Sequence, residues 1–286
     1  MRRRTGGPRD LALLGEHLET LRQEWRSRRL DSDPLVFVHR YADPADREVV
    51  AFLSASLAFG RVASIQASVG RVLEVMGASP AEFLAAWDER PIPPLSRFVH
   101  RWVTGSDVQD FLRMVKRARR AHGSLGALFA AGDEDGPADY VAALSSFHRN
   151  LFLLLSSPGA ARTALSRGLR FLLPSPAAGS ACKRSHLFLR WMIRTEGFDL
   201  GLWTGGRFTP ARLLLPMDVH VHRISNRIGL TRRKTADLAA SREATGWLRL
   251  LNPEDPVAYD WPLSRLGILS EPMTLPTRPT RTPARA

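Results

Sequence analysis

Two short stretches of the sequence hold residues whose types and spacing could do chemistry. In GSACKR, Lys183 follows Gly179 by four residues, and in MDVHVHR, Asp218 precedes two alternating histidines. A lysine amine can attack an electrophilic carbon and form a Schiff base. A nearby carboxylate can stabilise the positive charge that develops on such a carbon. Lys183 and Asp218 are therefore candidates for catalysis, although either could be purely structural, Lys183 as a surface lysine and Asp218 as a helix cap.

The two histidines after Asp218 allow a second chemistry, a metal site. In an extended chain, side chains two residues apart share a face, so Asp218, His220 and His222 could bind the metal of a hydrolase. On a helix, the same two histidines diverge by about 200° and cannot share one ion. Asp218 is a suitable N-cap, and apolar residues recur after it at spacings of three and four, which favours a helix. We therefore expect no metal and no other cofactor, and keep the metal-dependent hydrolase as an alternative.

A helix is also expected to present Lys183. Two prolines and Gly179 form a tight turn before it, and the helix should begin near Ala181. The side of this helix that faces the core is expected to carry Leu187, Phe188, Trp191 and Met192. Lys183 then lies in the first helical turn. Both candidate residues are therefore expected at the N-terminal ends of helices.

The rest of the chain has helical spacing nearly throughout. Apolar residues recur every three or four positions, for example between Val49 and Leu57, and period-two runs are scarce. Proline and glycine fall between these segments, as in GASP, RPIPP and GDEDGP, where helices should stop. A chain of 286 residues, 44% of them hydrophobic, is long enough for one large domain or two lobes. We therefore predict an all-α fold.

Positive charge is concentrated around the candidate residues. The formal net charge of the chain is +13, and residues 161–234 alone carry 14 lysines and arginines against three acidic residues, a net charge of +11. Phosphate contacts supply most of the non-specific affinity of a protein for nucleic acid. This density of cations therefore predicts a polyanionic partner.

Composition also excludes several classes of protein. Cys182 is the single cysteine, so the chain can form neither an internal disulfide nor a multi-cysteine metal cluster. No apolar run is long enough to cross a bilayer, and no signal-peptide core follows the MRRR start. We expect a cytoplasmic protein without a membrane partner. Residues 1–8 and 271–286 are expected to be disordered tails around one helical domain, residues 9–270.

Together, these stretches resemble the helix-hairpin-helix superfamily of DNA glycosylases, which carry a Gly/Pro-rich loop followed by an aspartate. In that superfamily the pattern Gly-x-x-x-Lys opens a helix, and its lysine is the nucleophile of the members that also cleave the strand. Gly179 to Lys183 matches this pattern. A later segment, apolar-Asp-x-His-x-x-Arg, carries the catalytic aspartate and matches at Asp218. The separation of the two residues is most similar to that in archaeal 8-oxoguanine DNA glycosylases, with residues 197–216 as the inserted part.

The resemblance implies a fold and a set of DNA contacts. It implies two helical lobes with a cleft between them, in which residues 172–230 hold the hairpin and the catalytic segment. The run from Glu48 to Leu73 resembles an early helix pair of the superfamily, whose loop, here Ala58 to Arg61, faces DNA. The residues expected to contact DNA are Gly60, Arg61, Gly179, Ser180, Ala181, Arg184, Arg232, Arg233 and Lys234. The candidates for a base pocket or a wedge are Phe59, Trp191, Trp203 and His220.

The function implied by the resemblance is base excision repair by a DNA glycosylase with AP-lyase activity. The partner would be double-stranded DNA with a damaged base, and an oxidised purine such as 8-oxoguanine is the first candidate. The protein would act as a monomer in the cytoplasm, associated with the nucleoid through DNA. A non-catalytic DNA-binding protein that uses the same hairpin is the first alternative. The run from about Tyr41 to Ile268 also resembles a bacterial group of conserved proteins of uncharacterised function.

Overall fold

The computed structural model describes residues 8, 10–25, 33–134, 138–155 and 165–269. Within these ranges the chain is mostly helical, with thirteen α-helices, three 3₁₀ helices and one two-stranded antiparallel sheet. This confirms the predicted all-α class. The two tails predicted to be disordered lie outside the described residues, apart from Pro8.

The elements follow one another along the chain with mostly short connections. The first group is α1 (Leu11–Trp25), α2 (Leu35–Val38), α3 (Pro44–Ser56), α4 (Val62–Met76), α5 (Pro80–Ala86), η1 (Pro93–Leu95), β1 (Val99–His100), β2 (Val103–Thr104), α6 (Gly105–His122) and α7 (Leu125–Ala131). The second group is α8 (Val141–Leu153), α9 (Arg167–Leu172), η2 (Pro176–Ala178), α10 (Lys183–Ile193), η3 (Pro210–Arg212), α11 (Val219–Arg227), α12 (Leu238–Leu251) and α13 (Asp260–Leu269). The two stretches with candidate residues fall at the starts of α10 and α11.

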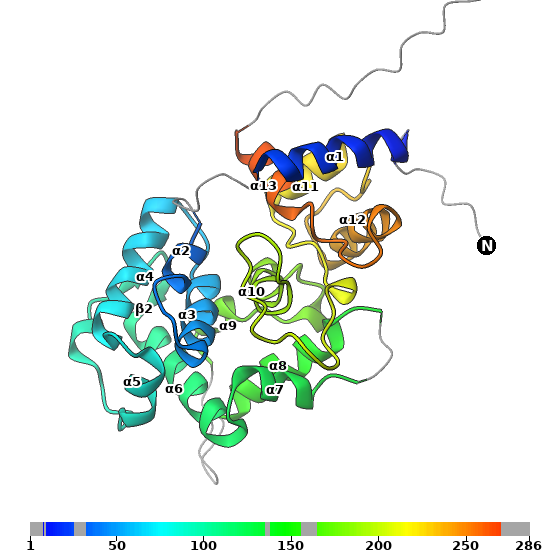
Figure 1. Ribbon diagram of the computed structural model, residues 1–286. Coiled ribbons are helices and arrows are strands. Elements are labelled where there is room, and N and C mark those ends of the chain that lie inside the picture. Colours follow the sequence, from blue (N-terminus) through cyan, green and yellow to red (C-terminus); the bar gives the residue numbers. More distant parts are fainter. Residues whose placement is uncertain (1–7, 9, 26–32, 135–137, 156–164, 270–286) are drawn as a thin grey trace, which may run out of the picture.

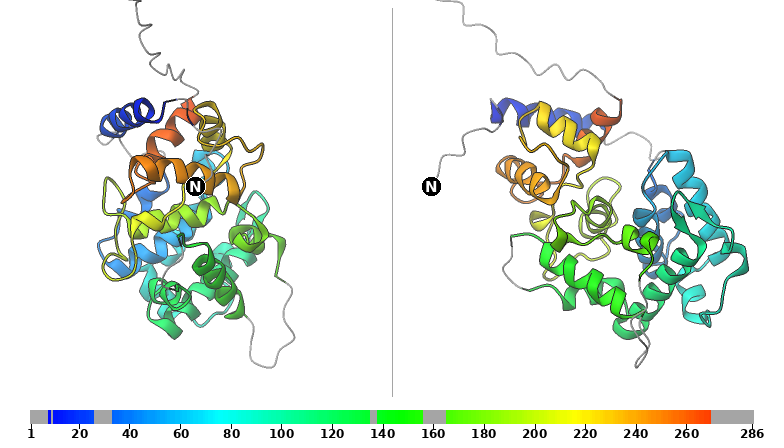
Figure 2. Two further views of the ribbon diagram at one scale, coloured as in Figure 1. Left: turned by 90° about the vertical axis from the view of Figure 1, so that its right-hand side faces the viewer. Right: turned by 180° about the vertical axis from the view of Figure 1, so that it is seen from behind.

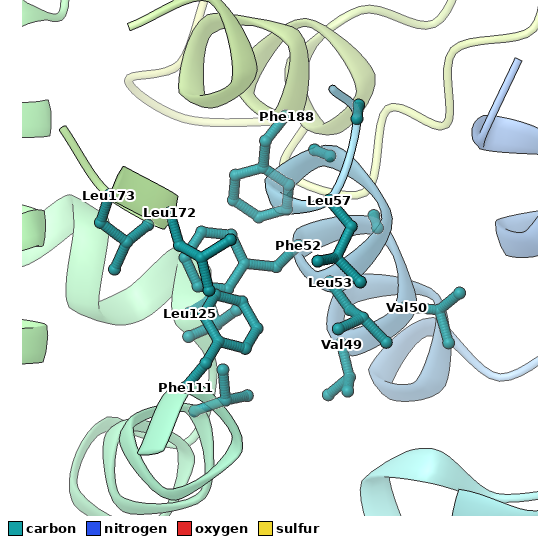
Figure 3. Packing of buried hydrophobic residues seen from close by; sticks show 14 of the residues in the cluster. Val49, Val50, Phe52, Leu53, Leu57, Phe111, Leu125, Leu172, Leu173 and Phe188 are labelled. Carbon is teal, nitrogen blue, oxygen red and sulfur yellow. The ribbon is translucent and has the colours of Figure 1, made fainter. Parts of the chain in front are cut away.

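A large hydrophobic core is built around α3, which is buried along most of its length. The ring centroid of Phe52 on α3 lies 4.9 Å from that of Phe111 on α6 and 4.9 Å from that of Phe188 on α10. Figure 3 shows these rings with leucine and valine side chains packed around them. This first core fixes α10, the helix that begins with Lys183, against α3.

A second hydrophobic core joins helices from the two ends of the chain. It is formed by α1, α11, α12 and α13, with buried residues such as Leu18, Ile224 and Leu263. Figures 1 and 2 show these four helices grouped together, with α10 between them and the rest of the chain. The hairpin before α10 contributes to both cores, because Ala181 belongs to the second core and Cys182 to the first.

Buried ion pairs attach α10 to the second core. Arg190 on α10 pairs with Asp260 at the start of α13 and, at 3.2 Å, with Asp199. One turn further, Arg194 pairs with Asp255 at 2.8 Å. A buried charge without a partner costs several kcal/mol, so the two helices must keep the orientation that satisfies these pairs.

Glu48 on α3 is a buried carboxylate that holds two distant segments. Its Oε2 accepts a hydrogen bond from the backbone N–H of Leu125, and its Oε1 accepts one from the N–H of Gly126, both at 2.9 Å. Oε1 also accepts a hydrogen bond from Nε1 of Trp203 at 2.9 Å. One side chain thus caps the start of α7 and fixes the loop that contains Trp203.

Replacing Glu48 by alanine is expected to lower the free energy of unfolding by about 3 kcal/mol or more, because each buried donor that loses its acceptor costs about 1–3 kcal/mol. Urea unfolding followed by circular dichroism measures this difference. The matched control is Glu74→Ala on α4, where the side chain is exposed. Its expected effect is within about 0.5 kcal/mol. Equal effects of the two substitutions would contradict the capping role of Glu48.

Two histidines are buried where α8 meets α10. Nδ1 of His148 lies 3.0 Å from the carbonyl oxygen of Pro174, and its Nε2 lies 3.1 Å from Oγ of Ser185. The ring nitrogens of His186 have no hydrogen-bond partner in the described part of the chain. Burial lowers the pKa of both histidines from the ordinary value of 6.5 to about 4.

The stability of the protein is therefore expected to fall as the pH is lowered from about 6.5 to about 4. In this range the unfolded chain binds a proton at each histidine and the folded chain does not, so each contributes a slope of up to about 1.4 kcal/mol per pH unit. His186→Leu removes a ring that makes no hydrogen bond and is expected to flatten the dependence, as measured by urea unfolding across this pH range. His122→Leu at the exposed end of α6 is the control. A His186→Leu protein with the slope of the wild type would contradict this account.

Candidate functional site

Lys183 and Asp218 lie against each other in the folded chain. Nζ of Lys183 is 3.7 Å from Oδ2 of Asp218, although the two residues are 35 positions apart in the sequence. Lys183 is the first residue of α10 and Asp218 is the N-cap of α11, so the pair joins the starts of two helices. Their side chains are 30% and 28% exposed. Both the amine and the carboxylate are therefore partly open to solvent.

The hairpin before Lys183 contains two residues with left-handed backbone conformation. The 3₁₀ helix η2 is followed by its C-cap Gly179, whose φ of 80° is one that glycine adopts without strain. Cys182 has a φ of 42°, and α10 begins directly after it, two residues later than the sequence predicts. The backbone N–H of Leu238 donates to the carbonyl oxygen of Gly179 at 3.1 Å, which attaches the hairpin to the start of α12. These contacts determine where the chain presents Lys183.

Cys182, the residue before Lys183, is a packed residue. Its thiol donates a hydrogen bond to the carbonyl oxygen of Pro174 at 3.3 Å and is buried in the first core. Burial raises the pKa of the thiol to about 11. The thiol therefore stays protonated at neutral pH and does not have the low pKa of a reactive cysteine.

The two carboxylate oxygens of Asp218 face different groups. Oδ1 accepts hydrogen bonds from the backbone N–H groups of His220 and Val221, both at 2.9 Å, and so caps α11. Oδ2 is the oxygen that faces Lys183. The predicted helix after Asp218 and the predicted cap are both confirmed. Capping engages one oxygen of the carboxylate and leaves the other facing Lys183.

The metal-site alternative required an extended segment after Asp218. The segment is instead helix α11, on which His220 and His222 point in different directions. Nε2 of His222 lies 3.0 Å from the carbonyl oxygen of Arg233, in the loop before α12. Across the ranges that the structure describes, no group of three or more His, Cys, Asp or Glu side chains is placed to hold a metal ion. The geometry therefore gives the metal-dependent hydrolase no support.

Most of the residues predicted to contact DNA are exposed. The exposed members are Gly60, Arg61, Gly179, Arg232, Arg233 and Lys234. Ser180 is half-buried and Ala181 is buried. Among the described residues, no carboxylate forms an ion pair with Arg61, Arg232 or Lys234. These three cations are therefore available to a phosphate.

Two arginines predicted to contact DNA are engaged within the protein. Arg233 pairs with Asp237, the N-cap of α12, at 2.9 Å. Arg184 is buried, donates to the carbonyl oxygen of Phe171, and lies over the rings of Phe59 and Phe171 at 4.8 and 4.2 Å. Burial lowers the pKa of its guanidinium group to about 10. Arg184 thus has a packing role in place of the predicted phosphate contact.

Two of the residues predicted for a base pocket or a wedge are buried in the first core. Trp191 has no exposed surface, and Trp203 is buried with its Nε1 bonded to Glu48. Neither indole can stack on a base while the core is intact, which corrects the prediction for both. Phe59 and His220 are half-buried and remain candidates.

Sequence reasoning missed an exposed aromatic residue beside Phe59. Trp102 lies between β1 and β2 and is 42% exposed, with its ring centroid 5.9 Å from that of Phe59. The available signal was the short alternating stretch FVHRWVT, which is typical of a small hairpin. Alternation predicts strands, but it does not show which side chains stay open to solvent.

The fold and the site define a helical protein with a solvent-accessible lysine–aspartate pair at the junction of two hydrophobic cores. Residues 33–269 match the model of the family described as "Protein of unknown function (DUF2400)". The chain therefore belongs to this family, whose description states no activity. The comparison with curated proteins and the comparison with solved structures each gave no match. In the described part of the chain, no helix has both the length and the apolar character needed to cross a membrane.

Proposed function

We propose that the protein is a DNA glycosylase with AP-lyase activity that acts on double-stranded DNA containing a damaged base. The observation that carries this proposal is the 3.7 Å approach of Lys183 Nζ to Asp218 Oδ2, at the starts of two helices and open to solvent. The resemblance to helix-hairpin-helix glycosylases assigns these two residues as nucleophile and catalytic carboxylate. An amine and a carboxylate at this distance suit attack on a sugar carbon with stabilisation of its positive charge.

The reaction would proceed in two stages. After the damaged base has left the helical stack, the neutral amine of Lys183 attacks C1′ of the deoxyribose. The C1′–N bond to the base breaks, and its electron pair leaves on the base, which takes up a proton. The Asp218 carboxylate stabilises the positive charge on the sugar during this step. Opening of the sugar ring, with a proton taken up at O4′, gives a Schiff base between Lys183 and C1′. Loss of a proton from C2′ then allows β-elimination, in which the C3′–O bond breaks and its electron pair leaves with the phosphate of the strand.

A DNA partner is supported by the distribution of charge and by the position of the lysine–aspartate pair. Arg61, Arg232 and Lys234 are exposed without a carboxylate partner in the described residues. Residues 161–234 carry a net charge of +11. The pair lies where two hydrophobic cores meet. We further propose an oxidised purine such as 8-oxoguanine as the lesion, a monomeric protein, and a cytoplasmic location associated with the nucleoid.

Borohydride trapping with the full-length protein tests this proposal. Sodium borohydride reduces a Schiff base to a stable covalent complex, which is resolved from free protein and free DNA by gel electrophoresis. The substrate is a duplex with a single 8-oxoguanine, an unmodified duplex sets the background, and release of free base is followed in parallel. A covalent complex and free base are expected from the damaged duplex alone.

Two other results would change the conclusion. Base release without a trapped complex would retain the glycosylase and remove the lyase activity. The proposal would be overturned if the protein bound DNA but gave neither product, on 8-oxoguanine and on a panel of oxidised and alkylated bases. That result would favour a non-catalytic DNA-binding protein. Asp218 would then act as the cap of α11, which its two hydrogen bonds from backbone N–H groups also allow.

A further inference from the structure

An exposed tryptophan stands at the tip of the small sheet. β1 and β2 pair in antiparallel fashion, and Arg101 and Trp102 form the turn between them. Arg101 has a φ of 57°, in the left-handed region that residues with a Cβ adopt at a cost. The indole of Trp102 remains partly open to solvent. The fold therefore accepts backbone strain at a turn that presents an aromatic ring to solvent.

The exposed indole is supported from behind by other rings. The ring centroid of Trp102 lies 4.7 Å from that of Phe171, nearly perpendicular to it, and 5.9 Å from that of Phe59. His100, just before the turn, is fixed at both ring nitrogens, by Oγ of Ser68 and by the carbonyl oxygen of Phe59, each at 2.9 Å. The indole therefore has a rigid support, and little conformational freedom would be lost when a ligand covers its outer surface.

The same rings connect the tryptophan to the candidate site. Phe59 and Phe171 enclose the guanidinium group of Arg184, as described above. Arg184 directly follows Lys183 at the start of α10. One layer of side chains thus separates Trp102 from the helix start that carries Lys183. A duplex bound at Lys183 is expected to extend to Trp102.

Uncompensated cations lie beside the tryptophan. The guanidinium group of Arg101 lies over the Trp102 ring, 5.1 Å from its centroid. A Cβ placed on Gly60 would be 3.6 Å from the side chain of Arg101, so the loop that carries Arg61 lies next to the turn. Neither arginine forms an ion pair with a carboxylate of the described residues. An aromatic ring beside cations that no carboxylate neutralises suits a nucleobase and its phosphates.

We propose that Trp102 stacks on a nucleobase of duplex DNA at a position where a neighbouring base is missing or flipped out. In an intact duplex both faces of each base are covered, so an indole finds a free face only where a base has left the stack. Removal of a damaged base leaves such a gap, and in this respect the inference rests on the proposed function. The expected consequence is a preference for duplexes with an abasic position over intact duplexes.

Fluorescence anisotropy with the full-length protein measures this preference, on a duplex with a single tetrahydrofuran abasic analogue and on the same duplex intact. Trp102→Ala is expected to weaken binding to the abasic duplex by about tenfold, the size of one base–aromatic contact, and to change binding to the intact duplex by less than about twofold. Trp102→Leu keeps the packing against Phe171 but lacks the extended ring, and the same loss is expected. Trp102→Phe should keep most of the preference. Leu250→Ala, at an exposed apolar residue of α12, is the matched control.

This inference would be overturned if Trp102→Ala and Trp102→Leu weakened binding to the intact duplex as much as binding to the abasic duplex. It would also be overturned if Leu250→Ala caused the same loss of binding to the abasic duplex. The tetrahydrofuran analogue cannot form a Schiff base, so the result does not depend on catalysis. A preference lost in the Trp102 variants, with neither base release nor covalent trapping by the wild type, would keep the stacking role and reject the glycosylase. Trapping by the wild type with an unchanged preference in the variants would reject the stacking role alone.

Discussion

Replacing Lys183 by glutamine is expected to abolish the covalent complex with the 8-oxoguanine duplex, a loss of at least about a thousandfold in trapped product. Glutamine keeps the polarity and nearly the length of the side chain, but its amide nitrogen is not a nucleophile and cannot form a Schiff base. The Lys183 side chain is partly exposed and contacts Asp218 at 3.7 Å, so folding should tolerate the change. Binding to the same duplex is expected to fall by only about a few-fold, because one phosphate contact at most is lost.

Lys116→Gln on α6 is the matched control, since it removes an equal charge away from α10. Its Nζ donates to the carbonyl oxygens of Leu84 and Ala85 at the end of α5, at 2.7 and 2.8 Å. Trapping at the wild-type level is expected for this variant. If the Lys183→Gln protein still formed the complex at the wild-type level, another amine would be the nucleophile, and the assignment of Lys183 would fail.

The second large effect is expected for Asp218→Asn, which removes the negative charge of the side chain but keeps its role as a helix cap. The asparagine side chain can still accept hydrogen bonds from the backbone N–H groups of His220 and Val221, and asparagine is a favourable N-cap. It has no negative charge to stabilise the sugar cation. Base release under single-turnover conditions is therefore expected to slow by about a hundredfold to a thousandfold. The free energy of unfolding should stay within about 0.5 kcal/mol of the wild-type value.

Asp218→Ala removes the charge and the cap together. It should slow base release as much as Asp218→Asn does and, in addition, lower the free energy of unfolding by about 1 kcal/mol. Urea unfolding and single-turnover base release on the three proteins separate the two functions of the carboxylate. Wild-type base release by the Asp218→Asn protein would show that Asp218 matters only as a helix cap.

Local sequence was sufficient for the start and cap of α11, and it predicted the start of α10 to within two residues. Asp218, followed by apolar residues at spacings of three and four, predicted α11 and its cap, and both are present. The start of α10 was predicted near Ala181 and lies at Lys183, because Cys182 takes a left-handed conformation that its residue type does not indicate. Caps and helical periodicity involve near neighbours in the chain, so a sequence states them directly.

The burial of single side chains depended on segments far away in the chain. Arg184 and Trp203 were expected to face DNA, yet Arg184 is enclosed by two phenylalanine rings and Trp203 is bonded to the buried Glu48. Trp102, which the sequence did not single out, is exposed. Arginine and tryptophan suit both environments, because each has apolar surface to bury and donors that can find partners inside or outside.

By itself, the sequence determined the all-α class, the helices that begin at the two candidate residues, and the basic character of the chain. The tertiary structure alone decided that Lys183 and Asp218 lie 3.7 Å apart, and which basic and aromatic side chains stay open to solvent. The physical reason is the range of the interactions. Periodicity, caps and charge depend on residues within a few positions of one another, whereas a contact across 35 positions depends on how helices from the whole chain pack into two cores.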